Sequence, residues 1–257
     1  MLMFLPGMLR PGCRAATIRR FCAALLCLAV LSGQSSAAQA ASAPPPAANR
    51  TVDGSVCLTI DDGNSRQAIQ RDLDALKAQG VHCTFFVIGS CLRANSDLWR
   101  RAVKEGHEVC YHSMHHDYMG GWSDARIAKD LDDWNRTARE VLKGYTSPKL
   151  ARLPGGSGSS NQRILRLFES KGYQLVLWNV DTFTGAIKNH RSISAYIKGR
   201  TQAGSIILTH FTGQDAAALN QYLGWLKSHF TLTTVSRGLQ QPVKRKPGPL
   251  PPPPVIR

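Results

Sequence analysis

Residues 56–63 have the sequence VCLTIDDG, in which a largely apolar run is followed at once by two aspartates and a glycine. An apolar run of this length favours a buried strand, and the glycine indicates that a loop begins there. Residues 108–116, EVCYHSMHH, have the same plan, because polar residues again follow a short run that favours a strand. Both segments therefore predict a strand that ends in polar side chains.

The polar side chains after these two strands form a ligand set that a borderline divalent cation favours. The first segment supplies the carboxylates of Asp61 and Asp62, and the second supplies His112 and His116, which are four residues apart. Zinc binds carboxylate and imidazole ligands, and an open fourth position leaves water available for chemistry. Together the two segments predict a metal-dependent hydrolase.

Strand-like and helix-like segments alternate along the rest of the chain. The clearest helical pattern begins after Ser123, a good N-cap, and places apolar residues from Ile127 to Val141 on one stripe. The predicted strands are Val56–Ile60, Cys83–Ile88, Glu108–Tyr111, Lys149–Leu153, Leu175–Asn179, Ser205–Thr209 and Leu232–Val235. Repeated strand–helix units imply parallel strands joined by right-handed crossovers.

Unusual polar clusters follow five of these strands at their carboxyl ends. They are Asp61-Asp62, His112, Pro154-Gly155-Gly156, Asp181 and His210. Barrel enzymes and open α/β sheets both place their sites at that edge. We therefore predict an α/β fold, an irregular (β/α) barrel with seven parallel strands, and keep an open doubly wound sheet as the alternative.

The two ends of the chain are predicted to lie outside this fold. Residues 1–40 combine a basic start, an apolar run and an Ala-Gln-Ala site, which is the pattern of a secretory signal peptide removed on export. An Ala/Pro-rich linker at 41–52 precedes a catalytic domain at 53–236, and a basic, Pro-rich tail at 237–257 follows. We expect an exported protein, periplasmic or secreted, with no transmembrane segment in the mature chain.

Charge and cysteine content limit the functional classes. The formal net charge is +15, and removal of residues 1–40, which hold four arginines and no acidic residue, leaves +11. This charge fits attraction to an anionic cell-envelope surface, or simply a basic exported protein. No nucleic-acid motif accompanies it, and we expect no nucleic-acid partner. The remaining cysteines, Cys57, Cys83, Cys91 and Cys110, allow three disulfide pairings or a role as small buried apolar residues.

Five short motifs occur in order near the predicted strand ends: TIDDG (59–63), HSMHH (112–116), RLPGG (152–156), WNVDT (178–182) and LTH (208–210). Together they resemble the five motifs of the polysaccharide deacetylases, the NodB-homology or carbohydrate esterase family 4 proteins, over about residues 53–236. One such motif is weak evidence, whereas an ordered set is specific. The resemblance implies removal of N-acetyl groups from the amino sugars of peptidoglycan, a chitin-like polymer or poly-N-acetylglucosamine.

The resemblance also implies a metal centre. Asp62, His112 and His116 would bind one divalent ion, most often zinc, with cobalt, nickel or manganese as alternatives. We expect the two imidazoles to converge because residues four apart lie on one face of a helical turn. His115 is out of line with His112, and we expect it to lie outside the ligand set.

Catalytic roles follow from the same resemblance. Asp61 would be the base for the metal-activated water, and strand alternation argues against its being a further ligand. Arg152 would orient that base, and Asp181 would contact Arg152 or His210, either as a structural ion pair or as part of the catalysis. The Gly155 N–H would help to hold the oxyanion, and His210 would protonate the leaving amine.

For two further residues, packing in the apolar core is an alternative to contact with the substrate. Leu208 matches the residue beside the acetyl methyl group but is equally compatible with a barrel core. Trp178 could stack on a sugar ring, although core packing is the better expectation for a strand tryptophan. The fourth motif departs from the family, because Thr184 stands where many relatives have a second acid and Gly185 provides no aromatic wall.

Two alternative functions remain open. An O-acetyl carbohydrate esterase would use the same residues on an ester, whose alkoxide leaves more readily than an amine. A catalytically silent glycan-binding module would bind metal and sugar without deacetylation, and the Thr184 departure and the basic tail suit it. Because both proton-transfer residues, Asp61 and His210, are present, we expect the deacetylase.

Overall fold

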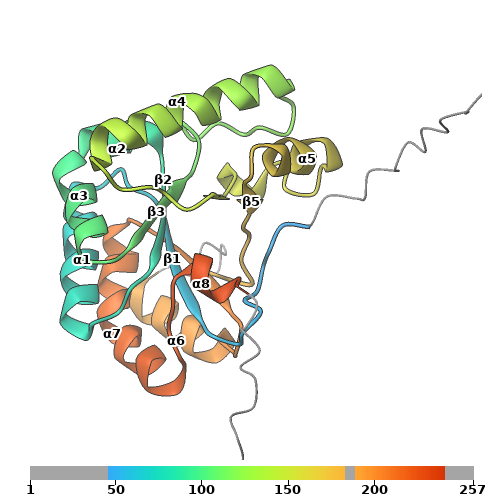
Figure 1. Ribbon diagram of the computed structural model, residues 1–257. Helices are drawn as coiled ribbons and strands as arrows, with labels where there is room; N and C mark the ends of the chain where they lie inside the picture. Colours follow the sequence, from blue (N-terminus) through green and yellow to red (C-terminus); the bar gives the residue numbers. More distant parts are fainter. Residues whose placement is uncertain (1–45, 183–188, 241–257) are drawn as a thin grey trace, which may run out of the picture. The chain divides into compact units, whose positions relative to one another are not determined.

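The computed structural model describes residues 46–182 and 189–240, which form a curled parallel sheet covered by helices (Figure 1). Seven strands of this described part make one sheet in the order β5-β4-β3-β2-β1-β7-β6, and all neighbouring strands are parallel. The strands are β1 (Cys57–Asp62), β2 (Thr84–Val87), β3 (Glu108–Tyr111), β4 (Leu150–Ala151), β5 (Gln174–Leu175), β6 (Val180–Asp181) and β7 (Ile206–His210). The predicted irregular barrel of seven parallel strands is confirmed.

The short connection between β5 and β6 shows how strongly the sheet is curled. These two strands are opposite edges of the sheet, yet the chain passes directly from Leu175 to Val180. Five residues span at most about 18 Å, whereas seven strands laid flat at a spacing of about 4.8 Å would separate the edges by about 29 Å. The sheet therefore curls through at least about half of a full turn, and the segment between β5 and β6 bridges its two edges.

Side-chain alternation divides the strand residues between two layers of the core. On β1, Leu58 and Ile60 belong to the large cluster that also contains the buried residues of the helices, whereas Cys57 belongs to a second cluster. The second cluster consists of Cys57, Phe86, Cys110, Leu150, Val176, Ile206 and Val235. It fills the inside of the curled sheet, and Asp61 shares that inner face because it is an even number of residues from Cys57.

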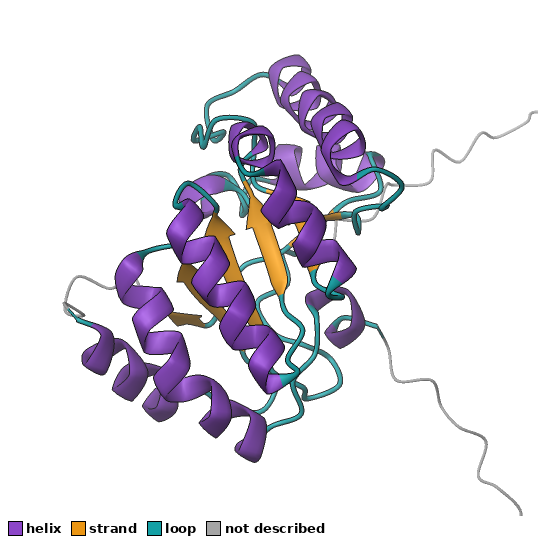
Figure 2. Ribbon diagram, turned by 90° about the vertical axis from the view of Figure 1, so that its left-hand side faces the viewer, coloured by secondary structure: helices purple, strands orange, loops and turns teal. Residues whose placement is uncertain are grey.

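Helices lie over the outer face of the sheet, as the purple ribbons over the orange strands in Figure 2 show. They are α1 (Arg66–Gln79), α2 (Gly89–Ala94), α3 (Ser96–Lys104), α4 (Asp124–Leu142), α5 (Gln162–Ser170), α6 (His190–Arg200) and α7 (Gly213–His229). The short helix α8 (Val235–Gly238) lies apart from them, with Val235 in the inner cluster, and Pro154–Gly156 form a 3₁₀ turn, η1. The predicted N-cap of α4 is confirmed, because the Ser123 hydroxyl accepts the Arg126 N–H. Ile127, Leu131 and Trp134 form its buried stripe.

Three of the predicted strands are shorter or divided in the structure. The predicted strand Cys83–Ile88 is reduced to Thr84–Val87 of β2. The predicted strand Lys149–Leu153 is reduced to the two residues of β4. The predicted strand Leu175–Asn179 is wrong as a single unit, because Leu175 ends β5 on one sheet edge and β6 begins at Val180 on the other. The residues between Leu175 and Val180 connect the two edges of the sheet, so the predicted strand contains the end of one edge strand and leads to the start of the other.

The predicted strand Leu232–Val235 is wrong, because Leu232 makes an isolated bridge to Val56 and helix α8 begins at Val235. Two side chains from the start of neighbouring strands explain this change. The Thr84 hydroxyl accepts the Val235 N–H at 2.9 Å, and the Glu108 carboxylate accepts the N–H of the next residue at 3.3 Å. These acceptors satisfy the first N–H groups of a helix, which have no partner within it.

The four described cysteines are free thiols. Cys57, Cys83 and Cys110 are buried and Cys91 is partly buried, and these four described cysteines form no disulfide with each other. The interpretation of the cysteines as small buried apolar residues is therefore favoured, and the disulfide alternative is not observed among these four. No helix among residues 46–182 and 189–240 is long and apolar enough to span a membrane. The predicted signal peptide at 1–40 lies outside the described residues, as do most of the predicted tail and both Thr184 and Gly185.

Candidate metal and catalytic site

The predicted metal ligands lie together at the carboxyl ends of β1 and β3. Asp62 Oδ1 is 3.4 Å from His112 Nε2 and also 3.4 Å from His116 Nε2. Asp62, His112 and His116 form a group whose ligand atoms all lie within 4.8 Å of one another. His115 is exposed and is not part of this group, as predicted.

The spacing of these atoms suits a tetrahedral ion. Two donors at about 2.0–2.1 Å from a tetrahedral zinc lie about 3.3 Å apart, close to the observed 3.4 Å. Asp62 Oδ1 is buried and makes no hydrogen bond to any described residue, although it faces two imidazole nitrogens. A buried carboxylate oxygen without a hydrogen-bond partner is costly, and a cation between it and the imidazoles would satisfy all three atoms.

The local backbone that brings Asp62 and His116 together differs from the predicted strand and helical turn. Asp62 and His116 both have left-handed backbones, with φ of 82° and 63°, and so does Ser113 at 61°. The segment from His112 to His116 is an irregular loop, and the predicted helical turn is wrong. The Ser113 hydroxyl accepts the His116 N–H at 2.8 Å and fixes this loop.

The same backbone change brings both aspartates towards His112. Alternation on a regular strand would point Asp61 and Asp62 to opposite sides. The strand ends at Asp62 with a left-handed residue, and Asp61 Oδ2 lies 3.8 Å from His112 Nε2. Asp61 therefore lies beside the group of Asp62, His112 and His116, although it lies closer to Arg152 than to His112.

That contact is a buried ion pair with Arg152. The Arg152 side chain is fully buried, and its Nη1 donates to Asp61 Oδ1 at 2.7 Å and to Thr59 Oγ1 at 2.6 Å. Its Nη2 and Nε donate to the carbonyls of Leu177 and Val176 at 3.0 and 3.3 Å. The planar guanidinium thus has partners on each of its nitrogens, and it holds one oxygen of Asp61 in a fixed position.

Two interactions set the orientation of His112. Its Nδ1 lies 2.8 Å from the carbonyl oxygen of Arg152, which makes Nδ1 the protonated nitrogen and leaves Nε2 free as an electron-pair donor. The loop that follows is held by Asp130 on α4, whose carboxylate accepts the Met114 N–H at 3.1 Å and the Tyr111 hydroxyl at 2.5 Å. Asp130 was not predicted, although it is a charged residue on the apolar stripe of α4.

The charges of the site shift several pKa values. Burial raises the pKa of Asp62, but His112, His210 and His116 outweigh burial and hold it below the ordinary value. Burial lowers the pKa of His112, but the carboxylates of Asp61 and Asp62 outweigh it and leave the pKa raised. Burial and the neighbouring His112 lower the pKa of His116. The site therefore stabilises the negative charge of Asp62 and the positive charge of His112, whereas it favours the neutral form of His116.

Three predicted residues lie on β6 and β7, beside β1. Asp61 pairs in register with His210, and Leu208 lies two residues earlier on the same face. Leu208 is buried, so core packing and contact with a substrate both remain compatible with its position. Asp181 is half-buried on β6. Burial lowers the pKa of Arg152, and the charge of Asp61 and, to a smaller extent, that of Asp181 oppose this shift.

The Pro-Gly-Gly turn η1 borders the site on the other side. Gly156 N–H bonds to the Leu153 carbonyl at 2.8 Å, whereas the N–H of exposed Gly155 makes no hydrogen bond to any described residue. Trp178 is half-buried, and its ring centroid lies 5.5 Å from the Arg152 guanidinium carbon. A Cβ on Gly156 would lie 3.7 Å from the Trp178 ring, so this tryptophan contacts the turn as well as the arginine.

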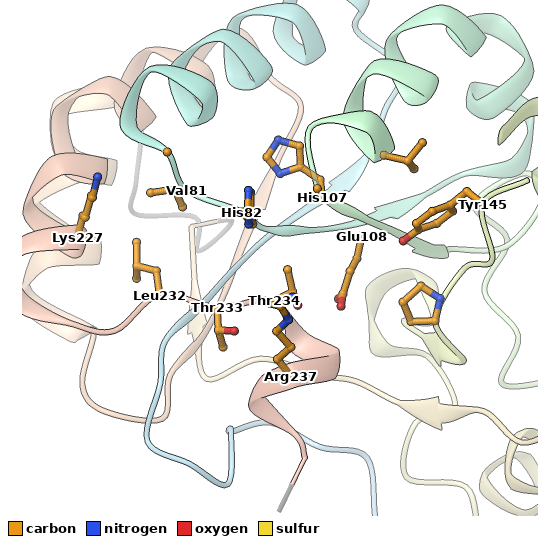
Figure 3. Close-up of a pocket in the computed structure, with 14 residues that line it drawn as sticks. Val81, His82, His107, Glu108, Tyr145, Lys227, Leu232, Thr233, Thr234 and Arg237 are labelled. Atoms are coloured by element: carbon orange, nitrogen blue, oxygen red, sulfur yellow. The ribbon is translucent and has the colours of Figure 1, made fainter. Parts of the chain in front are cut away.

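A cavity of about 410 Å³ opens at the other end of the barrel. Figure 3 shows its lining, in which His82, His107 and Glu108 stand at the starts of β2 and β3 and Arg237 stands on α8. None of the predicted metal or catalytic residues lines it. The Glu108 carboxylate there anchors α8 and accepts the Thr84 hydroxyl at 2.6 Å. These hydrogen bonds of Glu108 join α8 to the starts of β2 and β3 at this end of the barrel.

Comparison with known proteins identifies the family of the chain. The family model described as polysaccharide deacetylase matches residues 48–176. A peptidoglycan-N-acetylglucosamine deacetylase of Bacillus cereus is 32% identical over 192 residues, which are 72% of this chain and 88% of the relative. The chain belongs to the polysaccharide deacetylase family, and the predicted resemblance is confirmed.

Solved structures share the fold. A crystal structure of a peptidoglycan N-acetylglucosamine deacetylase has a TM-score of 0.69 at 25% identity, over 77% of this chain and 94% of that chain. A carbohydrate esterase family 4 pseudoenzyme from Bacillus anthracis has a TM-score of 0.70 at 23% identity, over 77% and 69% of the two chains, which shows the fold alone. Several matched relatives are longer, and the chain spans 65%, 36% and 34% of three of them.

Proposed function

We propose that this protein removes N-acetyl groups from amino sugars of a glycan, with peptidoglycan as the first candidate, and that it uses a divalent metal ion to do so. One observation carries the proposal: Asp62, His112 and His116 converge beside an aspartate, Asp61, that a buried arginine holds in place. The names of the relatives support peptidoglycan as the glycan, because the match from Bacillus cereus is a peptidoglycan-N-acetylglucosamine deacetylase.

Asp62, His112 and His116 are the residues that would hold the ion, with zinc as the first choice. A divalent metal bound there would polarise the acetamide carbonyl and make water acidic enough to react near neutral pH. His112 would present Nε2, because its Nδ1 faces the Arg152 carbonyl. His116 is partly exposed, with a side-chain exposure of 39%, which leaves one side of the group open to a substrate.

Asp61 would accept a proton from the attacking water. One of its oxygens, Oδ1, is occupied by Arg152 at 2.7 Å, and the other, Oδ2, faces His112 and the ligand group. A general base needs its accepting atom within hydrogen-bond reach of the proton that it removes. The ion pair with Arg152 thus directs the free oxygen of Asp61 towards the place where the water would be activated.

The remaining predicted residues would act on the acetamide and its leaving group. The Gly155 N–H would donate a hydrogen bond to the oxyanion that forms when water adds to the carbonyl. His210 would transfer a proton to the departing amine, which is a poor leaving group without it. Leu208 would contact the acetyl methyl group, Trp178 would border the sugar, and Asp181 would add negative charge near Arg152. The products would be acetate and a free amino sugar.

The test is release of acetate from N-acetylglucosamine oligomers and from peptidoglycan, before and after metal removal by a chelator. We expect activity to disappear with the chelator and to return with zinc. His116→Ala should abolish both metal binding and activity, whereas His115→Ala, a change to the exposed neighbouring histidine, should keep both. Activity that persists in the fully metal-free protein would overturn the proposal.

A comparison of amides with esters separates the deacetylase from an O-acetyl esterase. His210→Ala should reduce acetate release from N-acetyl substrates far more than release from O-acetylated xylan, because an alkoxide leaves with less help from an acid. Release from esters alone would favour the esterase. Binding of metal and sugar without release of acetate at any pH would assign the chain to silent glycan-binding modules.

A peptidoglycan substrate also fits export of the protein, which the sequence of residues 1–40 predicts. We propose cleavage near residue 40 and contact of the basic mature chain with the anionic cell envelope. Mass spectrometry of the protein recovered from the producing cell tests this: a mature chain that begins near residue 41 is expected, and an intact N-terminus in the cytosol would contradict it.

A further inference from the structure

Tyr118 presents an aromatic ring to solvent beside the proposed metal ligands. Among the described residues, the large apolar side chains classed as exposed are Val52 at 48% and Tyr118 at 63%. The Tyr118 ring centroid lies 6.1 Å from that of His116, with the rings inclined by 66°. The two rings meet edge to face, so Tyr118 packs against His116 on one side while most of its side chain stays exposed to solvent.

The turn opposite has a glycine where the tyrosine ring lies. Gly155 has φ of +59°, and a Cβ at this position would lie 2.4 Å from Tyr118 Cε1 and 3.3 Å from its hydroxyl oxygen. Contacts below 3.0 Å do not occur for real Cβ atoms. The ring therefore fills the space that any other side chain at position 155 would need, beside the residue whose N–H is proposed to hold the oxyanion.

Neighbouring residues fix the loop that carries Tyr118. Met119 is fully buried, and its sulfur lies 3.6 Å from the Tyr111 hydroxyl. The Gly120 N–H donates to the Ser157 hydroxyl at 3.3 Å, which ties this loop to the segment after the Pro-Gly-Gly turn. Since Met119 is buried in the core, the adjacent Tyr118 is held outward on a fixed backbone. Binding of a ligand to its ring therefore costs little conformational entropy.

An exposed aromatic ring on a glycan-processing surface suits the flat, C–H-rich face of a sugar. A single exposed aromatic residue needs no special explanation, but this one is fixed on both sides and lies between a proposed ligand and a proposed oxyanion donor. Because the rings of Tyr118 and His116 are in contact, no sugar fits between them. A sugar on the open side of Tyr118 would therefore be the neighbour of the one whose acetamide lies at the metal.

We propose that Tyr118 and Gly155 form a subsite for the sugar that adjoins the reacting sugar, with the Tyr118 ring stacked on it. The inference rests on the proposed deacetylation, and it adds that the chain selects oligomeric glycans over single sugars. Tyr118 is a binding residue in this arrangement, and Gly155 leaves room for its ring.

The test is the dependence of acetate release on oligomer length, from one to five N-acetylglucosamine units. Tyr118→Ala should raise KM for the pentamer by about tenfold, which corresponds to about 1.4 kcal/mol, and leave kcat within about twofold. Tyr118→Phe should keep the wild-type KM, because it keeps the ring. Val52→Ala, a change to the other exposed apolar residue, is the matched control and should alter neither constant.

Zinc titration separates this subsite from a supporting role for the loop. The zinc affinity of Tyr118→Ala should equal that of the wild type, because the ring is not a ligand. A wild-type length dependence in Tyr118→Ala would overturn the inference. A lower kcat with weaker zinc binding and an unchanged KM would also overturn it, since Tyr118 would then only support His116.

A second variant tests the fit between the tyrosine and the glycine. Gly155→Ala should weaken binding of the pentamer in the wild type by displacing the Tyr118 ring, and should weaken it less in the Tyr118→Ala background. Equal effects in both backgrounds would count against the pairing. Binding of the pentamer to the zinc-loaded protein by calorimetry needs no turnover. Binding that depends on Tyr118, without any acetate release, would therefore support the subsite while refuting the deacetylase.

Discussion

Replacing Arg152 with alanine should lower the free energy of unfolding by about 4 kcal/mol. The guanidinium is fully buried and holds the Asp61 carboxylate at 2.7 Å, so its removal leaves a buried carboxylate without its cation. Breaking a buried pair in this way costs about 3–5 kcal/mol. In a domain of this size each kcal/mol lowers the melting temperature by about 2–4 °C, so we expect a decrease of roughly 8–16 °C.

The assay is urea unfolding followed by circular dichroism, with two comparison proteins. Arg66→Ala removes an exposed arginine that makes a bidentate pair with Asp97 at 2.6 and 2.8 Å. It should change stability little, because solvent screens exposed pairs. The double variant Arg152→Met/Asp61→Asn removes both buried charges and should regain part of the stability lost in Arg152→Ala, because no unpaired charge is then buried.

Two results would refute this reasoning. If Arg152→Ala is as stable as Arg66→Ala, the pair between Arg152 and Asp61 is not shielded from water. If the double variant is as unstable as Arg152→Ala, the loss comes from the other contacts of the guanidinium. Those contacts are its bonds to main-chain carbonyls and its packing over Phe86, whose ring centroid is 4.2 Å from the guanidinium carbon.

Three further predictions concern single carboxylates. Asp130→Ala should weaken zinc binding by about 10–100-fold in a titration, because the loop of the proposed ligands loses its acceptor for the Met114 N–H. Glu108→Ala should destabilise the fold by about 1–3 kcal/mol in urea unfolding and speed hydrogen exchange in α8, whose N–H group it accepts. Burial, with the charge of Asp215, raises the pKa of Asp72 to about 8, so the folded state keeps a proton that the unfolded state releases near pH 4. Stability should fall as pH rises across that window, and Asp72→Asn should remove this slope in unfolding measured from pH 4 to 9.

The alternation of residues along the strands explains why the sequence placed the site so well. Cys57 and Asp61, and likewise Cys110 and His112, are separated by even numbers of residues, so each pair shares the inner face. The apolar members fill the inside of the barrel, and the polar members lie nearer the carboxyl ends of the same strands. The apolar runs of β1 and β3 are readable from the sequence and predicted both strands, and the polar residues that follow each run lie at the carboxyl ends of these strands.

What the sequence could not show depends on contacts between distant segments. The predicted strand at 232–235 is a run of apolar and β-branched residues, yet it ends as a helix because Thr84 and Glu108 accept the first N–H groups of α8. These acceptors are more than 120 residues away along the chain. Similarly, no local pattern indicates that β5 and β6 are opposite edges of the sheet, because this depends on how far the whole sheet curls.

Asp130 could have been found from its spacing. It lies three residues after Ile127 and four before Trp134, on the buried stripe of α4, where a charged side chain needs a partner. Its partners, the Tyr111 hydroxyl and the Met114 N–H, belong to the strand and loop that carry His112. A charged residue on an apolar stripe is thus a readable sign of a supporting contact, although the identity of the partner is not.

The proposed ligands illustrate the limit of local rules most clearly. Asp62 and His116 adopt left-handed backbones, which non-glycine residues avoid at a cost of about 1–3 kcal/mol each, and which cluster at functional sites. Hydrogen bonds compensate here, since the Asp62 carbonyl accepts the Ile88 N–H at 3.0 Å and the Ser113 hydroxyl accepts the His116 N–H. Sequence rules describe favoured conformations, so they singled out the residues that the fold brings together but predicted a regular strand and a helical turn around them. The unfavoured conformations are what direct one carboxylate oxygen and two imidazoles to a common point.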